Sequence, residues 1–383
     1  MNNMKKRDLE LYLHIPFCVK KCNYCDFFSA AGSREEQEAY VQAMIQEIRG
    51  YKDSLHSYEV KTVFLGGGTP SLLSERQAEE LFQSLYDSFT IQKDAEITME
   101  VNPGTVNLEK LKQYKAVGVN RLSLGLQSAR NEELQRLGRI HTYEDFLATW
   151  NFTEKAGFEN RNIDLMSALP GQSVTDYVNG LKKIIEYKPE HISAYSLIVE
   201  EGTPVYEHPE KFLPLPSEDD EREMYYETDR ILKKAGFDRY EISNYSKKGF
   251  ECRHNVGYWE RKDYLGFGLG ASSLFENVRM KNISDMNKYI GNAGESDLYE
   301  DTEILTVNDC MEEFMFLGLR MMKGVSSRRF LKLFNKNIND VYAEPLEENI
   351  KNNLLCKYRD DSGESWYCLT PHGIDISNTV MAD

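Results

Sequence analysis

The stretch His14-Ile-Pro-Phe-Cys-Val-Lys-Lys-Cys-Asn-Tyr-Cys-Asp-Phe27 decides how the rest of the chain is interpreted. It places Cys18, Cys22 and Cys25 within eight residues, directly after the apolar run Leu9–Ile15. Iron–sulfur clusters usually take four cysteines, so three thiolates would hold three corners of a four-iron cube and leave one iron open to a small molecule. An open position is typical of a working metal rather than a structural one. We therefore predict a 4Fe-4S cluster on this trio.

Two other roles for the cysteine trio fit less well. A zinc knuckle needs four ligands, and the nearest further candidate, His14, lies in the strand before the loop. Cysteines so close in sequence also make poor disulfide partners. The remaining cysteines are scattered and suggest no disulfide framework: Cys252, Cys310, Cys356 and Cys368. Reduced thiols and an oxygen-sensitive cluster together predict a cytoplasmic protein.

Composition narrows the possible functions. The 383 residues can form a barrel-sized domain plus a smaller one. The chain has 62 acidic and 46 basic residues, a net charge of -16, which disfavours nucleic-acid binding because phosphate contacts depend on Lys and Arg. No apolar segment of a secretory signal follows the first ten residues, and no run of roughly twenty apolar residues predicts a transmembrane segment.

Short apolar runs alternate with amphipathic helical patterns from residue 9 to about 200. The predicted strands are Leu9–Ile15, Lys61–Leu65, Ala95–Val101, Arg121–Leu126, Asn162–Met166 and His191–Leu197. The predicted helices are Glu35–Tyr51, Glu75–Ser88, Leu108–Ala116, Tyr143–Ala156 and Val174–Tyr187. This alternation predicts an α/β fold with a parallel sheet and right-handed crossovers. Six units are fewer than the eight of a closed barrel, so we predict a partial (β/α)6 barrel over residues 1–200.

The regular alternation of strands and helices stops in the second half of the chain. The proline-rich segment Glu200–Pro216 predicts a loop, and a charged helix, Ser217–Ala235, follows it. We take residues 201–300 as an extension of the barrel and the acidic segment Glu295–Glu303 as a linker to a C-terminal domain over residues 301–383.

The C-terminal domain resembles a winged helix in its order of elements. Its predicted elements are helices near Asp309–Met322, Ser326–Phe334 and Val341–Asn352, then a hairpin of Leu354–Tyr358 and Ser365–Leu369. Such α+β folds often bind DNA, and the second helix has a basic face made of Arg328, Arg329, Lys332 and Lys336. In an acidic chain we interpret this face as a solvated surface, and we expect no nucleic-acid partner.

Polar residues lie where the predicted parallel strands end, which is where function gathers in such barrels. They are the segment Gly66–Ser71, Glu100, Gln127, Arg139 and Asp164. Carboxylates suit ribose hydroxyls, an arginine suits a ligand carboxylate, and glycines let a ligand approach the backbone closely. A molecule that offers all of these partners is an adenosyl amino acid.

The order CxxxCxxC, then GGGTP, resembles radical SAM proteins. Within them, Tyr12–Phe27 resembles the group that contains oxygen-independent coproporphyrinogen III dehydrogenases and heme chaperones, and the similarity extends into the C-terminal domain. The resemblance implies a 4Fe-4S cluster on the three cysteines, with S-adenosylmethionine (SAM) on the fourth iron. It also implies SAM contacts at Tyr12, Tyr24, Gly67, Gly68, Thr69, Glu100, Gln127, Arg139, Asp164 and Ile198.

Two functions compete within this group. As a dehydrogenase, the protein would use a 5′-deoxyadenosyl radical to abstract hydrogen from coproporphyrinogen propionate chains. As a heme chaperone, it would bind heme and deliver it to acceptor heme proteins, among them respiratory membrane enzymes. Phe27 stands where the dehydrogenase has a fourth cysteine, and only about eight residues precede the first strand, so the N-terminal extension of that enzyme is missing. Both differences favour the chaperone.

The segment His254-Asn-Val-Gly-Tyr-Trp259 resembles the HNxxYW signature of the chaperone branch. The resemblance implies heme contacts at His254, Asn255, Tyr258 and Trp259. Histidine is a common axial heme ligand, and Tyr and Trp offer flat amphipathic faces. Without the resemblance, a lone histidine among aromatic residues is a hydrogen-bonded structural residue. Cys252 lies outside a CxxCH attachment sequence, which favours a buried thiol.

We therefore expect a heme chaperone that carries a 4Fe-4S cluster and SAM, and we assign no catalytic residue. Some relatives with this architecture are methyltransferases or heme-degrading enzymes, but nothing in the sequence marks a second SAM site. The sequence leaves open the heme acceptor, the second heme ligand, covalent or non-covalent attachment, SAM cleavage and the oligomeric state.

Overall fold

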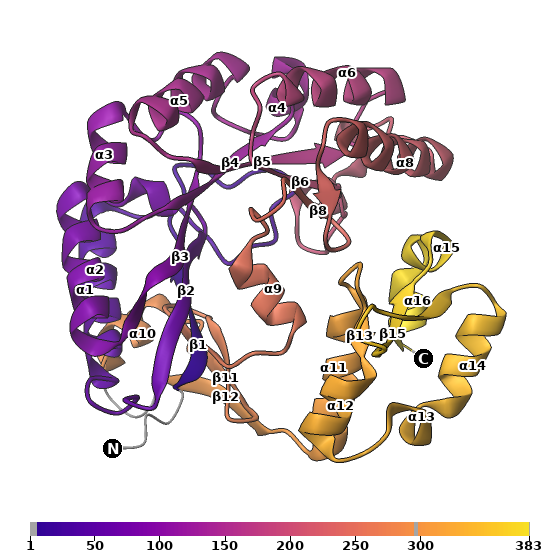
Figure 1. Ribbon diagram of the computed structural model, residues 1–383. Helices are drawn as coiled ribbons and strands as arrows, with labels where there is room; N and C mark the ends of the chain where they lie inside the picture. The colour runs from indigo at the N-terminus through magenta and orange to yellow at the C-terminus, as the bar shows by residue number, and fades with distance from the viewer. Residues whose placement is uncertain (1–5, 295–297, 383) are drawn as a thin grey trace.

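The computed structural model describes residues 6–294 and 298–382. A twelve-stranded sheet curves through the larger part of the molecule (Figure 1) in the order β12-β11-β10-β9-β1-β2-β3-β4-β5-β6-β8-β7. Its centre is parallel and consists of β1 (Arg7–Ile15), β2 (Tyr58–Gly67), β3 (Ile91–Val101), β4 (Arg121–Gln127), β5 (Asn160–Ser167) and β6 (His191–Ser196). The predicted partial (β/α)6 barrel is confirmed.

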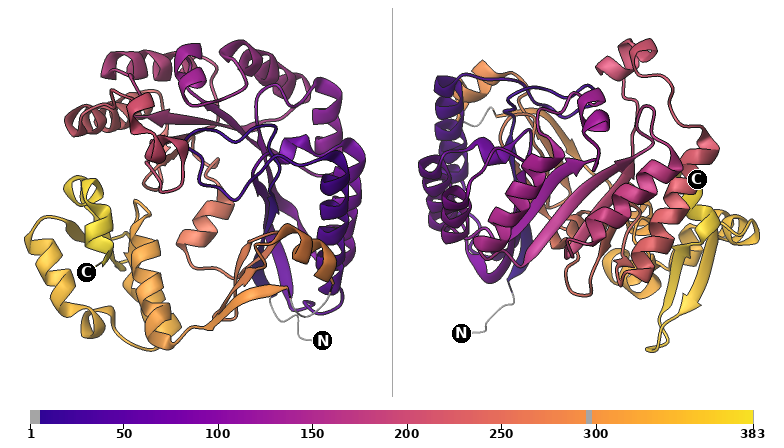
Figure 2. Two further views of the ribbon diagram at one scale, coloured as in Figure 1. Left: turned by 180° about the vertical axis from the view of Figure 1, so that it is seen from behind. Right: turned by 90° about the horizontal axis from the view of Figure 1, so that it is seen from above.

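Helices cover the outer face of this curved sheet (Figures 1 and 2). They are α1 (Arg34–Gly50), α2 (Glu75–Ser88), α3 (Leu108–Ala116), α4 (Asn131–Arg136), α5 (Tyr143–Lys155), α6 (Val174–Ile185) and α8 (Glu218–Lys234). Four begin at a capping box, in which the N-cap side chain and the third helical residue satisfy each other's backbone N–H groups: Ser33, Ser74, Thr142 and Ser217. These local signals explain why most predicted helix boundaries agree closely with the structure.

The sheet extends beyond the six predicted strands at both edges. Beside β1 lie β9 (Tyr264–Phe267), β10 (Ser272–Phe275), β11 (Val278–Asn282) and β12 (Tyr299–Ile304). Beside β6 lie β8 (Asn244–Ser246) and β7 (Asp238–Arg239). Of these strands, β9 is parallel to β1, whereas β8 is antiparallel to β6. Residues 201–300 therefore continue the barrel sheet.

The prediction of a linker over Glu295–Glu303 is wrong from residue 299 onward. Residues 295–297 lie outside the described residues, but β12 pairs along its length with β11. Its acidic side chains are exposed, and Glu300 forms an ion pair with Lys281 at 2.6 Å. The acidic sequence correctly indicated exposed side chains. It did not distinguish a linker from an edge strand, whose side chains are also exposed although its backbone is hydrogen-bonded.

The described residues contain two large hydrophobic cores. One runs from Leu9 to Leu298 and joins the barrel to its extension, and the other lies between Met311 and Val380. The second core holds α11 (Val307–Leu319), β13 (Val325–Ser326), α12 (Ser327–Phe334), α13 (Ile338–Val341), α14 (Ala343–Lys351), β14 (Leu355–Arg359), β15 (Ser365–Leu369), α15 (Pro371–Asp375) and α16 (Ser377–Ala382). Helices followed by the β14–β15 hairpin give the expected winged-helix-like order.

The basic face expected on the second C-terminal helix is partly engaged within the protein. Arg328 lies 3.5 Å from a carboxylate oxygen of Glu364, and Arg329 lies 3.8 Å from one of Glu260. These arginines therefore connect α12 to neighbouring segments. No helix of the described residues is long and apolar enough to cross a membrane.

Short elements complete the described chain: η1 (Pro70–Leu72), α7 (Pro204–Glu207), η2 (Pro209–Lys211), α9 (Arg253–Trp259) and α10 (Met286–Asn292). The most consequential is α9, which lies inside the arc of the sheet rather than outside it (Figure 1). Glu96 of β3 accepts hydrogen bonds from the N–H groups of Arg253 and His254, at 3.1 and 3.2 Å, and so caps its first turn. A Cβ at Gly257 would clash with Glu10 of β1, so α9 fits closely against the strands.

Tyr40→Phe tests how α1 is tied to the barrel. The buried Tyr40 hydroxyl donates to the His14 carbonyl at 2.6 Å and accepts from the Leu269 N–H at 2.9 Å. Since the substitution leaves both groups buried and unpaired, we expect a loss of about 1–3 kcal/mol in the free energy of unfolding. Urea denaturation measures it.

The matched control is Tyr226→Phe, whose exposed hydroxyl bonds Asp375 at the surface. We expect a change within about 0.5 kcal/mol for this variant. Equal losses in both variants would contradict a special role for the Tyr40 hydroxyl.

Candidate cluster and cofactor site

A cavity of about 520 Å³ lies at the inner face of the barrel, and Cys18, Cys22 and Cys25 line it together. All three thiols are free and partly exposed. Among the described residues, no three His, Cys, Asp or Glu side chains converge closely enough to hold a single metal ion. The donor set fits a cluster, because each thiolate of a cluster binds a different iron.

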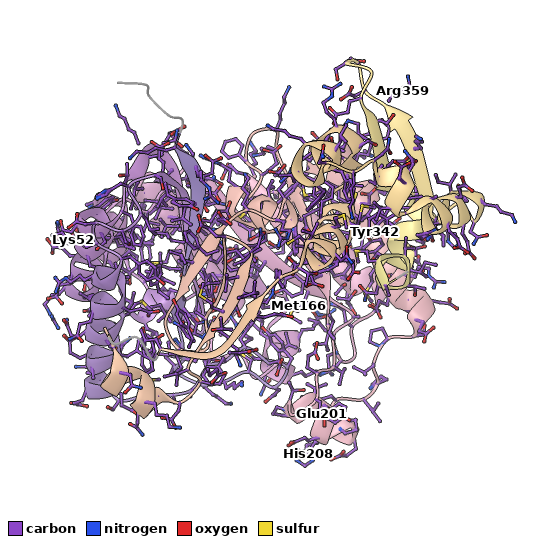
Figure 3. The ribbon with its side chains drawn as sticks, turned by 90° about the horizontal axis from the view of Figure 1, so that it is seen from below. Lys52, Met166, Glu201, His208, Tyr342 and Arg359 are labelled. Carbon is purple, nitrogen blue, oxygen red and sulfur yellow. The ribbon has the colours of Figure 1, made fainter. Side chains whose placement is uncertain are left out.

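The cysteine loop is held by backbone hydrogen bonds to other parts of the chain. The Asn23 N–H donates to the Leu137 carbonyl at 2.9 Å, and the Asn23 amide donates to the Arg136 carbonyl at 2.9 Å. The Asn23 carbonyl in turn accepts from the Val205 N–H at 3.1 Å, in the segment that leads to His208 and projects from the body of the molecule (Figure 3). The loop therefore bridges two segments that follow β4 and β6.

The strand end before the cysteines also shapes the loop. The Nε2 atom of His14 lies 2.7 Å from the carbonyl oxygen of Phe28, and Cys18 N–H donates to the Ala30 carbonyl at 3.0 Å. These bonds tie the two ends of the loop to each other.

The glycine segment after β2 packs directly against this region. Gly67 has a φ of 106°, and a Cβ there would lie 2.5 Å from the His14 ring. A Cβ at Gly68 would lie 2.8 Å from the Phe17 carbonyl oxygen. Only glycine permits this backbone conformation and this approach without strain. The glycine run therefore brings Thr69 to the cysteines, with its hydroxyl 3.4 Å from the Cys18 sulfur.

Arg139 connects the cluster loop to the strand ends. Its guanidinium donates to the Gly125 carbonyl at 2.7 Å and to the Asn102 side-chain oxygen at 2.6 Å, and it lies 3.6 Å from the Cys22 sulfur. Asn102 also donates to the Thr69 hydroxyl at 2.7 Å. A neighbouring guanidinium stabilises a thiolate, which is the form that binds metal.

Two buried carboxyl groups lie on the neighbouring strands. Glu100 accepts from the Gly67 N–H at 3.2 Å, and burial together with the nearby Asp164 raises its pKa to about 8. Asp164 accepts from the Asn162 amide at 2.6 Å and from the Ser123 hydroxyl at 3.2 Å, and burial raises its pKa as well. Both carboxyl groups face the same cavity and can receive hydrogen bonds from a polar ligand.

The remaining predicted SAM contacts lie around the cavity rim. The backbone of Gln127 has a φ of 69°, and its side-chain oxygen accepts from the Tyr195 hydroxyl at 3.0 Å. Tyr24 packs on an apolar cluster that includes Leu137, and Ile198 is 67% exposed.

The structure brings nine of the ten predicted SAM contacts to the cavity lining: Tyr24, Gly67, Gly68, Thr69, Glu100, Gln127, Arg139, Asp164 and Ile198. Tyr12 is the exception, since its hydroxyl lies 3.0 Å from the His14 Nδ1 atom instead. Several lining residues were missed by sequence reasoning: Asn102, Arg121, Ser123, Asn162, Ser193 and Tyr195. One signal in the sequence could have identified them. Parallel strands covered on both faces are usually apolar throughout, whereas these strands have polar residues at every second position.

The predicted heme contacts do not share one cavity. Asn255 lines the main cavity, whereas Trp259 lies against Arg320, whose guanidinium is 4.5 Å from the indole ring centre. His254 is 1% exposed, and its Nδ1 and Nε2 atoms lie 2.7 Å from the Thr62 hydroxyl and 2.9 Å from the Tyr258 hydroxyl. Both ring nitrogens are thus engaged within the protein, so a heme iron could reach His254 only after α9 moved.

Burial also sets the protonation of this segment. It lowers the pKa of His254 to about 3, with the charge of Arg121 as a second cause, so the imidazole is neutral at physiological pH. The Cys252 thiol is 1% exposed, which confirms the prediction of a buried thiol.

Comparisons with known proteins agree with this site. The family model of the Radical SAM superfamily matches residues 12–184, and that of the HemN C-terminal domain matches residues 305–376. A curated protein of Lactococcus lactis named heme chaperone HemW is 35% identical, over 99% of this chain and 97% of its own length. The chain belongs to the HemW family.

Other members of the HemW family match equally far. The heme chaperone HemW of Bacillus subtilis is 35% identical over 97% of each chain, and that of Escherichia coli is 34% identical over 99% of this chain and 98% of its own. Among solved structures, coproporphyrinogen III oxidase (HemN) from Escherichia coli covers 100% of this chain and 91% of its own, with a TM-score of 0.84 and 24% identity. This match shows a shared fold.

A radical SAM domain implies a 4Fe-4S cluster and SAM, and the residues present fit both. The cysteine trio would hold the cluster, while Arg139, Glu100 and Asp164 offer one cation and two carboxyl groups to an adenosyl amino acid. The chemistry that this pair supplies when bound is radical chemistry. The residues that line the cavity would bind and orient the pair.

The pKa of Glu100 predicts a pH dependence of SAM binding. SAM carries a sulfonium that is positive at every pH and ribose hydroxyls that donate hydrogen bonds, so it binds better when Glu100 is ionised. Because the pKa of Glu100 is about 8, we expect SAM affinity to rise about tenfold between pH 7 and pH 9. Equilibrium dialysis against anaerobically reconstituted protein measures the affinity.

In Glu100→Gln the rise should disappear, whereas the surface variant Glu132→Gln should retain it. A pH profile that is the same in wild type and Glu100→Gln would show that another group controls SAM binding.

Proposed function

We propose that this protein is a heme chaperone, which binds heme and transfers it to acceptor heme proteins. The observation that carries the proposal is the match to heme chaperones HemW from several bacteria over nearly the whole of both chains. Phe27, which stands where the dehydrogenase pattern has a fourth cysteine, supports it.

The mouth of the cavity supports heme as the cargo. Phe27 is 68% exposed, and Val19, Phe28 and Ile198 are exposed near it in the chain or at the cavity rim. Exposed aromatic and aliphatic side chains suit the flat apolar face of a porphyrin. Lysines at positions 20 and 21 line the same cavity and could pair with propionates.

The destination of the heme is a finer part of the proposal. We expect acceptors among respiratory heme enzymes of the membrane, reached from the cytoplasm, where free thiols stay reduced. All seven cysteines are free in the structure, which is compatible with that compartment.

The second candidate function is oxygen-independent dehydrogenation of coproporphyrinogen III. The fold shared with HemN and the nine predicted SAM contacts that line the cavity favour it. A test must therefore separate porphyrinogen turnover from heme uptake.

We expect anaerobically reconstituted protein to take up hemin stably and to leave coproporphyrinogen III unchanged. Soret absorbance after gel filtration measures uptake, and chromatography of the porphyrins measures turnover in the presence of SAM and a reductant. Formation of protoporphyrinogen at catalytic rates would overturn the chaperone proposal. Transfer of the bound heme to an apo-acceptor preparation should follow uptake.

The role of His254 as a heme ligand stays a prediction that a matched pair of variants can test. If α9 opens and His254 binds the iron, His254→Ala should change the Soret maximum and weaken heme binding about tenfold or more. His208→Ala, which removes an exposed histidine, should change neither.

If His254 is only structural, heme spectra stay unchanged while the variant loses stability, because the Thr62 and Tyr258 hydroxyls lose their partner. Thermal unfolding of the same samples separates the two results.

A further inference from the structure

Polar side chains continue down the inner face of the barrel, well below the level of the cysteine loop. On β4, Arg121, Ser123 and Gly125 line the cavity at alternate positions, and Asn162 does so on the neighbouring strand. A strand rises about 3.3 Å per residue, so the Cα of Arg121 lies about 13 Å below that of Gly125, whose carbonyl Arg139 contacts. The cavity thus has a floor that is distant from the residues expected to hold the cluster.

Arg121 is a buried cation at this floor with unused donors. It is 1% exposed, and its Nε and Nη1 atoms have no hydrogen-bond partner among residues 6–294 and 298–382. Buried guanidinium donors almost always have acceptors, and a free pair beside a cavity points to an acceptor that comes from outside. The side-chain oxygen of Asn244, which also lines the cavity, is unpaired as well.

The neighbouring carboxyl groups are committed to other partners. Glu96 accepts from the N–H groups of Arg253 and His254 at the start of α9. Asp164 accepts from Asn162 and from a serine hydroxyl, and burial raises its pKa. Neither carboxyl group accepts a hydrogen bond from Arg121, although the charges of both help to raise the pKa of its guanidinium.

We propose that the cavity floor is a second ligand compartment in which Arg121 binds the carboxylate of a ligand. Guanidinium groups bind carboxylates through charge-assisted N–H···O bonds, and the Arg121 side chain lines the cavity with no hydrogen-bond partner for two of its three nitrogens among the described residues. Ser193, Asn244 and Asn255 supply further polar atoms to the lining of the same cavity. A carboxylate of this kind could belong to a heme propionate or to a small carboxylic acid.

The two sources are separated by the choice of probe. In the first arm, hemin and hemin dimethyl ester are titrated into the holoprotein and followed by Soret absorbance. In the second arm, sodium propionate is titrated by calorimetry. Both arms use wild type, Arg121→Gln and the matched control Arg161→Gln, whose arginine pairs with Glu190 and stacks on Trp150 away from the cavity.

If a heme propionate occupies the floor, the dimethyl ester binds wild type about 10- to 100-fold more weakly than hemin, and Arg121→Gln reduces that difference about tenfold, whereas Arg161→Gln leaves it unchanged. If a small carboxylic acid occupies it, propionate binds wild type and Arg161→Gln but not Arg121→Gln, while hemin and its ester bind alike. Either result supports the compartment.

The proposal is overturned if hemin and its dimethyl ester bind with equal affinity, Arg121→Gln does not change that affinity, and propionate binds wild type and both variants alike. That result would mean that the floor holds water only. Absence of any hemin binding by wild type would instead contradict the heme chaperone function, and the propionate arm alone would then decide. Near-UV circular dichroism checks that Arg121→Gln is folded. If that variant does not fold, Arg121→Lys gives an independent result, because it keeps the positive charge but loses the guanidinium donors.

Discussion

Buried polar groups need partners, and this constraint governs how the open barrel is covered. The inner face of the six parallel strands carries charged and hydroxylated residues, including Glu10, Thr62 and Glu96. Such groups are costly inside a protein unless each one finds a hydrogen-bond partner. Helix α9 supplies partners for two of these three: its N–H groups bind Glu96, and His254 binds Thr62, whereas one carboxylate oxygen of Glu10 has no hydrogen-bond partner among the described residues. The HNVGYW segment is therefore first of all a lining for the barrel interior.

At the cysteine end of the barrel interior, buried polar groups find their partners through backbone hydrogen bonds of the cysteine loop. The cysteine loop has little regular structure, and its backbone groups bind Pro16 after β1, Leu137 after α4 and Val205 in α7. Glycine at positions 67 and 68 allows this packing, since any Cβ there would meet the first strand or its histidine. The cysteines are placed by this network of backbone bonds and close contacts.

Much of the fold was predictable because it depends on local signals. Capping residues such as Ser74 and Thr142, and the apolar runs between them, mark elements that are also the elements of the barrel. The edge strands were not predictable in this way. Strand β12 is acidic and exposed, and it exists because β11 offers unpaired backbone groups, which is information held by a distant part of the chain.

The residues of the candidate site also differ in how far they could be predicted from the sequence. Nine of the ten predicted SAM contacts line one cavity because they lie near the ends of parallel strands or in the segments that follow them, and parallel strands bring those ends together. The inner row below them escaped prediction, since Arg121 and Asn162 look like ordinary polar residues within strands. For His254, sequence resemblance indicated a ligand, whereas its surroundings show two hydroxyl partners that a sequence cannot reveal.

The position of α9 links heme binding to the interior of the barrel. Asn255 faces the main cavity, while Arg253 and Val256 line a second cavity of about 660 Å³ on the other side of the helix. Moving α9 to free His254 would break two hydrogen bonds of that ring and the two to Glu96, each worth about 0.5–3 kcal/mol. A heme that binds His254 must supply this free energy, and its apparent affinity falls accordingly. A ligand that contacts Asn255 from the main cavity incurs no such cost, so that face of α9 is the part of the segment that a cargo meets first.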